Sequence, residues 1–251
     1  MKLINRMFQF SVIIIALTAL TLTQTRAQAN IKLGGGIGLM SPVSDFGGST
    51  IDYYNGSRYG LSSGLNIHGK VKIGFSVLNL TGEIDYSSLS NTGNSEPGMG
   101  SVDISQKIFS LKVGPEYRFI LPAFPFTPYL GFNLAMNSFS GETTFQGVAK
   151  VPSATYSVQS ATRFGVGLYA GTEVSLNSSL SLDFNISYNL MNLAGRQWND
   201  VNPLTKQRID SYLSLNDAKD PLYTEGDDKN IISNARSIQS VLFTVSILFG
   251  L

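Results

Sequence analysis

The chain has 251 residues, among them 18 Lys or Arg, 17 Asp or Glu and no Cys. The absence of Cys excludes disulfides and a lipid-modified N-terminal cysteine, and the near-balance of charge argues against nucleic acid as a partner. Charged residues make up 14% of the chain, whereas soluble domains carry about a quarter.

Residues 1–29 have the three parts of a secretory signal peptide. Lys2 and Arg6 form a positive region, 8–22 an apolar core, and 27–29 a small-x-small cleavage site. We expect export and removal of this segment, with an uncleaved N-terminal anchor as the alternative. Cleavage after residue 29 leaves one domain, residues 30–251, and cleavage after residue 27 would begin the mature chain at Gln28. It holds 15 basic and 17 acidic residues once Lys2, Arg6 and Arg26 are removed.

The rest of the chain alternates between apolar and polar side chains, and this period of two predicts β-strands. The expected strands cover residues 31–39, 59–73, 75–89, 102–120, 126–139, 161–174, 180–190 and 235–251. No later stretch reaches the roughly eighteen apolar residues of a membrane-spanning helix, so a membrane would be crossed by strands.

The strand at 235–251 predicts how the sheet closes. Val241, Phe243 and Val245 begin an unbroken apolar side that continues to Leu251. A strand this apolar would be an aggregation site if it were a free edge. We therefore expect it to pair with the first strand in a closed barrel.

The connections are expected to alternate between long and short. The long ones are 41–57, 90–101, 141–158, whose edges could also be strand, and 191–234, and the tight ones lie near residues 73–74, 121–125 and 177–179. This pattern places the long loops at one end and the tight turns at the other, an asymmetry typical of outer-membrane barrels.

The polar side of the strands carries most of the charges. They are Lys70, Glu83, Asp85, Lys112, Glu116, Arg118, Arg163, Glu173 and Asp183. In a soluble barrel these residues would face water, whereas in a membrane barrel they would fill the lumen as a structural polar network. Aromatic residues near the strand ends favour lipid: Tyr86, Tyr117, Phe119, Tyr188 and Phe249. Glu83 and Lys112 lie at similar heights on neighbouring strands, so we expect them to pair within about 8 Å.

The chain resembles the small OmpA/OmpX-like outer-membrane barrels in four features: eight alternating strands, a signal peptide, the glycine-rich segments LGGGIGL and RFGVGLYAG, and the terminal segment SILFGL. The resemblance implies an all-β fold, an eight-stranded antiparallel transmembrane up-and-down β-barrel with short periplasmic turns and long outer loops. It also implies the outer membrane of a Gram-negative bacterium, contact with outer-membrane lipid, and recognition of the last strand by the barrel assembly machinery. That machinery usually reads a terminal aromatic residue. Here the signal is altered, with Leu251 last and Phe249 two places before it.

No residue pattern predicts catalysis, a cofactor or a metal. His68, the only histidine, is expected in a luminal polar network, and the acidic group Glu225, Asp227 and Asp228 lacks the ligand spacing of a calcium loop. We expect a non-enzymatic protein with a structural or surface-interaction role, whose outer loops contact an unknown external partner. The alternatives are a narrow channel for small solutes, a lipid-modifying enzyme that uses His68, and a secreted soluble ligand-binding barrel.

Overall fold

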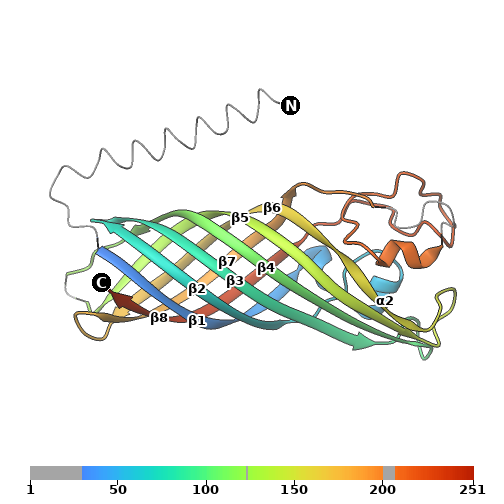
Figure 1. Cartoon of the computed structure of the whole chain (residues 1–251), viewed down its shortest axis with the longest axis horizontal. Coiled ribbons are helices and arrows are strands. Elements are labelled where there is room, and N and C mark those ends of the chain that lie inside the picture. The colour runs from blue at the N-terminus through green and yellow to red at the C-terminus, as the bar shows by residue number, and fades with distance from the viewer. Residues whose placement is uncertain (1–29, 123, 200–206) are drawn as a thin grey trace, which may run out of the picture.

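The computed structural model of the chain describes residues 30–122, 124–199 and 207–251 (Figure 1). The expected signal peptide, residues 1–29, lies outside the described residues. So do residue 123 and part of the loop expected at 191–234.

Eight antiparallel strands form a closed barrel in which each strand pairs with its neighbours in sequence and the last pairs with the first. They are β1 (Asn30–Val43), β2 (Gly64–Phe75), β3 (Leu78–Gly93), β4 (Ser101–Arg118), β5 (Phe126–Gln146), β6 (Ala154–Ser175), β7 (Leu180–Ala194) and β8 (Gln239–Gly250). The fold class predicted from the sequence is therefore confirmed. Among the described residues, no helix is long and apolar enough to cross a membrane.

The two ends of the barrel differ. Turns 76–77, 119–125 and 176–179 lie at the end where β1 begins and β8 finishes, on the left in Figure 1. The opposite end carries connections 44–63, 94–100, 147–153 and the described part of 195–238. The described residues of these connections include three short helices: η2 (Ser44–Phe46), α2 (Thr50–Tyr54) and η3 (Arg208–Tyr212). The long connections therefore share one end, which is the outer end of an outer-membrane barrel.

The apolar faces of the strands point outward. On β4, Phe109, Leu111 and Val113 are 43%, 38% and 52% exposed, whereas Lys112 and Glu116 are 8% and 1% exposed. Because the charges fill the centre and the apolar side chains form the wall, the alternative of a soluble ligand-binding barrel is wrong.

The apolar wall has a definite height. On β5 the outward residues from Phe126 to Met136 are apolar, and the next outward residues are Ser138, Ser140 and Glu142. Ten residues at about 3.3 Å each, tilted by about 40°, span about 25 Å along the barrel axis. This height matches the apolar band of an outer-membrane barrel.

Beyond this band the polarity of the strands reverses. On β4, Ile104 and Ile108 point inward and are buried, whereas Asp103 and Lys107 point outward and are exposed. The switch occurs between Ile108 and Phe109, two consecutive apolar residues. The outer part of the barrel is therefore built like a soluble protein, with an apolar interior and a polar surface.

Two stretches that were expected to be loops are partly strand in the structure. Residues 141–158 are mostly strand, because β5 continues to Gln146 and β6 already begins at Ala154, and part of 90–101 belongs to β3. The alternation continues there in the opposite sense, with Phe139 and Phe145 buried inside.

The expected start of the second strand at Tyr59 is also wrong, because β2 begins at Gly64. Gly60 has φ +65°, a left-handed conformation that interrupts an extended strand. Leu61, an apolar residue within that expected strand, is 3% exposed and packs in the apolar core of the outer end.

Candidate functional site

A network of buried ion pairs occupies the lumen within the apolar band. Asp183 on β7 is fully buried and accepts hydrogen bonds from Lys70 Nζ and Lys72 Nζ, each at 3.0 Å. The hydroxyl of Tyr129 donates a third hydrogen bond to Asp183, at 2.7 Å. Strands on opposite sides of the barrel are thereby joined through one carboxylate.

Lys72 joins this carboxylate to two others. Its Nζ lies 3.2 Å from Glu116 Oε2 and 3.8 Å from Glu173 Oε2, and it sits 4.1 Å from the centroid of the Tyr129 ring. Glu173 is directly opposite Asp183 in the β6–β7 register, so the lysine separates two carboxylates that would otherwise repel each other.

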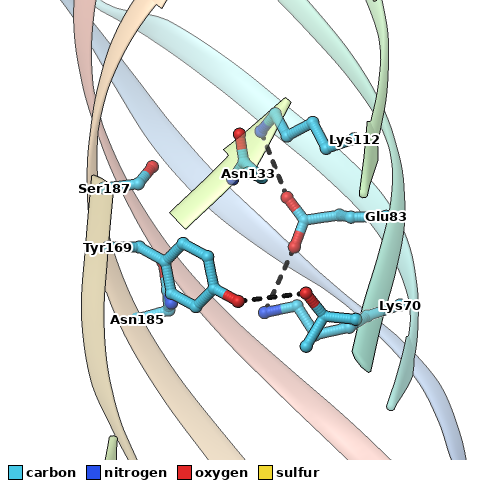
Figure 2. Close-up of a pocket in the computed structure, with 8 residues that line it drawn as sticks. Lys70, Glu83, Lys112, Asn133, Tyr169, Asn185 and Ser187 are labelled. Atoms are coloured by element: carbon cyan, nitrogen blue, oxygen red, sulfur yellow. Dashed lines mark hydrogen bonds and ion pairs between the residues drawn. The ribbon is translucent and has the colours of Figure 1, made fainter. Parts of the chain in front are cut away.

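Glu83 and Lys112 form the pair expected from their heights on the strands. Lys112 Nζ lies 3.1 Å from Glu83 Oε1 and 2.8 Å from Asp85 Oδ2. Figure 2 shows Glu83 between Lys112 and Lys70, with the second carboxylate oxygen 3.2 Å from Lys70 Nζ. The cavity beside these groups measures about 20 Å³, room for about one water molecule.

Seven of the nine predicted luminal charges belong to this network, and two do not. Arg118 is half-buried at the turn end of β4 and makes no side-chain hydrogen bond or ion pair among the described residues. Arg163 lies at the outer end, where it binds a loop. Lys32 and Lys72 were missed: Lys32 pairs with Glu173 and stands opposite Lys72 in the β1–β2 register. The same alternation that placed Lys70 inside also places these two residues inside.

A second cluster, which we call the outer plug, fills the outer end of the barrel. It is apolar and combines strand residues such as Phe139 and Phe145 with loop residues such as Phe46, Tyr53 and Tyr212. The ring of Phe46 lies 6.4 Å from that of Phe139, and the hydroxyls of Tyr53 and Thr143 are 2.8 Å apart. Loop 44–63 and the described residues of the last loop, 195–199 and 207–238, therefore lie over the outer end of the barrel and fill it with apolar side chains (Figure 1).

Asp217 fastens the last loop to the barrel wall. Arg163 donates to it through Nε at 2.9 Å and Nη2 at 2.8 Å, and Asn192 Nδ2 donates at 2.9 Å. Burial alone would raise the pKa of Asp217, but the hydrogen bonds from Arg163 and Asn192 and from the Gln197 backbone hold it below its ordinary value. The Asp217 carboxylate therefore stays ionised and holds the loop at neutral pH.

Arg236 is a second fastening point for the outer plug. Its guanidinium lies 4.2 Å from the centroid of the Tyr59 ring and donates to the carbonyl oxygens of Leu215 and Asn216 at 3.2 and 2.8 Å. One cation thus joins the first outer loop to the last.

His68 has neighbours that resemble a nucleophile and an orienting group. Its Nε2 lies 2.7 Å from Ser246 Oγ, and its Nδ1 lies 3.1 Å from Asn66 Oδ1. However, Ser246 and Asn66 are each 1% exposed and face the lumen. A lipid in the surrounding membrane does not reach this serine through the wall of the barrel.

Two of the three acidic side chains at 225–228, Asp227 and Asp228, are engaged within the outer loops. Asp228 pairs with Lys150 at 2.5 Å, and Asp227 accepts hydrogen bonds from the backbone of Lys229 and the side chain of Asn230. Within the described ranges, no group of His, Cys, Asp or Glu residues forms a metal site.

The closed eight-stranded barrel, the outward apolar band and the charged lumen define an integral outer-membrane β-barrel protein. The chain belongs to the family described as outer membrane protein beta-barrel domain, which matches residues 12–207. Its place is therefore the outer membrane of a Gram-negative bacterium. No curated protein sequence matches the chain.

Several solved barrels are similar in structure. Neisserial surface protein A is 15% identical, with 87% of this chain and 96% of that one covered and a TM-score of 0.48. Ail, the attachment invasion locus protein of Yersinia pestis, solved with the heparin analogue sucrose octasulfate, is 10% identical, with 89% and 99% covered and a TM-score of 0.40. The N-terminal barrel of Pseudomonas aeruginosa OprF is 9% identical, with 89% and 100% covered and a TM-score of 0.39.

Proposed function

We propose that this barrel is a non-enzymatic surface-interaction module that binds an extended segment of an external protein at its outer end. The observation that carries the proposal is an open strand edge. β6 pairs with β5 out to Ala154, but its pairing with β7 ends at Phe164. The outer portion of β6 therefore has a partner strand on one side only.

Of the last loop's described residues, 195–199 and 207–238, few contact this edge. The Gln159 N–H donates to Leu213 O at 2.8 Å, and Asn199 Nδ2 donates to the Gln159 side chain at 2.7 Å. Nearer the tip, Thr155 and Ser157 are exposed, and no backbone bond joins residues 154–158 to any described residue of the last loop. Alternate residues of this segment point their N–H and C=O groups away from β5, which is the arrangement that strand addition uses.

The interior supports this role over the alternatives. Among the described residues, the cavity beside the ion network and the one within the outer plug measure about 20 Å³ each, which favours a closed barrel over a narrow solute channel. The burial of Ser246 and His68 disfavours a lipid-modifying enzyme. We propose that the luminal network is structural and that it holds the eight strands together.

Two further proposals concern the route to the membrane. Residues 1–29 direct export. The assembly machinery then reads the last strand through Phe249 and Leu251, which are 55% and 84% exposed on the outer wall. Replacing Phe249 with Ser should lower the amount of assembled barrel in cells. An unchanged amount would count against this assembly signal.

The surface role can be tested with the purified barrel in lipid nanodiscs and a displayed library of random peptides. We expect peptides rich in β-branched and aromatic residues to be retained, because such residues favour strands. The double variant T155K/S157K should bind the selected peptides several-fold more weakly, because lysines at an edge oppose strand pairing.

The matched control is S105K/S140K. It adds the same charge on the outer surface away from the open edge, at Ser105, which is paired with β3 and β5, and at Ser140, which is paired with β4 at the β5–β6 register shift. This variant should bind as the parent does. A barrel that retains no peptide, or peptides that bind T155K/S157K and the parent equally, would contradict the proposed function.

A further inference from the structure

The turn between β4 and β5 is apolar and exposed at the periplasmic end of the barrel. Its side chains are Phe119 (41% exposed), Ile120 (56%), Leu121 (38%) and Phe124 (57%), and Phe126 (36%) follows on β5. Water-exposed turns are normally built from small polar residues, so this one is unusual.

The other two turns at the same end show that a strand reversal here does not need a run of large apolar residues. Turn 176–179 is closed by Asn177, whose Oδ1 accepts hydrogen bonds from the backbone N–H groups of Ser179 and Leu180, both at 2.9 Å. Turn 76–77 is a short reversal that begins at Ser76 with φ 63°. Leu176 is 53% exposed and Val77 is half-buried, so each of these turns carries one apolar side chain, whereas the described residues of the β4–β5 turn include four large, exposed apolar ones.

Two aromatic pairs join the turn to the lipid-facing wall. The rings of Tyr117 and Phe119 lie 5.1 Å apart on the β4 side, and those of Phe124 and Phe126 lie 5.3 Å apart on the β5 side. Tyr117 and Phe126 both belong to the outward face of their strands. The Phe119 N–H also donates to Pro128 O at 2.8 Å, which extends the β4–β5 pairing into the turn. The apolar surface of the turn therefore continues the surface that contacts lipid.

We propose that this turn is a membrane anchor that lies in the phospholipid of the periplasmic leaflet, at the boundary between headgroups and acyl chains. Burying its apolar surface there is favourable, and aromatic rings prefer this depth. The anchor fixes the depth and tilt of the barrel on its β4–β5 side.

Tryptophan fluorescence tests this position directly. Trp198, in the last outer loop, is the chain's only tryptophan, so W198F provides a background without tryptophan. F124W is compared in that background with S178W, a polar turn residue at the same end of the barrel. Both proteins are placed in phospholipid nanodiscs, which leave both membrane faces open to an aqueous quencher.

We expect F124W to be quenched several-fold more strongly by bromine-labelled acyl chains than S178W, and several-fold less by acrylamide. Equal behaviour of the two variants would overturn the anchor and leave the turn in water, as a docking surface for a periplasmic protein would be. Protection from acrylamide without quenching by brominated lipid would also overturn it and would indicate contact between copies of the chain. I120W serves as a second reporter if F124W does not fold, as judged from the gel migration of unboiled protein.

Discussion

Asp183 is the residue whose loss should weaken the barrel most clearly. It is fully buried and neutralises two lysines, Lys70 and Lys72, each at 3.0 Å. Asp183→Asn keeps the size of the side chain and an oxygen for the Tyr129 hydroxyl, but it removes the charge. Breaking a buried ion pair from one side costs about 3–5 kcal/mol, because the remaining charge stays buried without compensation.

The assay is a urea titration of the protein refolded in phospholipid vesicles, with the folded fraction measured from the altered gel migration of unboiled protein. At a slope of about 2 kcal/mol per molar urea, a loss of about 4 kcal/mol lowers the midpoint by about 2 M. Asp228→Asn is the control, because Asp228 and its partner Lys150 are both more than half exposed and such pairs contribute little. Its midpoint should not change.

A second variant tests the reason for the loss. Lys70→Met removes one of the charges that Asp183 neutralises, while Glu83 keeps Lys112 at 3.1 Å. The double variant D183N/K70M should therefore lose less free energy of unfolding than the two single variants lose together. The difference, the coupling energy, should be about 0.5–3 kcal/mol. A D183N protein as stable as the parent, or a double variant with additive losses, would refute this reasoning.

Three other outcomes are expected. Below about pH 4 the last outer loop should become sensitive to protease. The pKa of Asp217 is lower in the folded protein than in the unfolded chain, so its carboxylate stabilises the fold above the unfolded-state pKa, and this stabilisation is lost as the pH falls. Equal cleavage at pH 7 and pH 3 would contradict the Arg163–Asp217 anchor. Gly36→Ala should greatly reduce the folded fraction, because an added Cβ would lie 1.9 Å from Val245 O. Gly69→Ala should fold normally, because its Cβ would meet only Gly34 O, at 4.0 Å. Similar folded yields of the two variants would show that the close approach of the backbones at Gly36 does not limit folding. In a planar bilayer the parent protein should pass no steady current, and a stable conductance would show that the luminal network and outer plug do not close the barrel.

Sequence periodicity was sufficient for the strands and faces within the apolar band. One rule, alternation with period two, placed Phe109 outside and Lys112 inside and brought Glu83 level with Lys112. The rule works there because lipid on one side and a narrow lumen on the other impose opposite demands on successive residues.

The same rule failed where those demands change. At Ile108 and Phe109 the apolar side switches from inside to outside, and two adjacent apolar residues conceal the switch in the sequence. The outer ends of β5 and β6 were accordingly expected to be part of the connection 141–158 and not of the strands. Arg163 was assigned to the luminal network because its partner, Asp217, lies 54 residues further along the chain, in a loop without periodicity. Contacts of this kind depend on tertiary packing, which local pattern does not encode.

The central claim is that lipid contacts the apolar face of the strands and that this contact ends between Phe109 and Lys107. Because the chain has no native cysteine, spin labels can be attached to single cysteines introduced at outward positions of β4 in lipid vesicles. Labels at Phe109, Leu111 and Val113 should collide mainly with oxygen dissolved in the bilayer, and labels at Ser105 and Lys107 mainly with a water-soluble nickel reagent. If the labels at 109, 111 and 113 were instead reached by nickel and shielded from oxygen, the wall would not face lipid and the account would be contradicted.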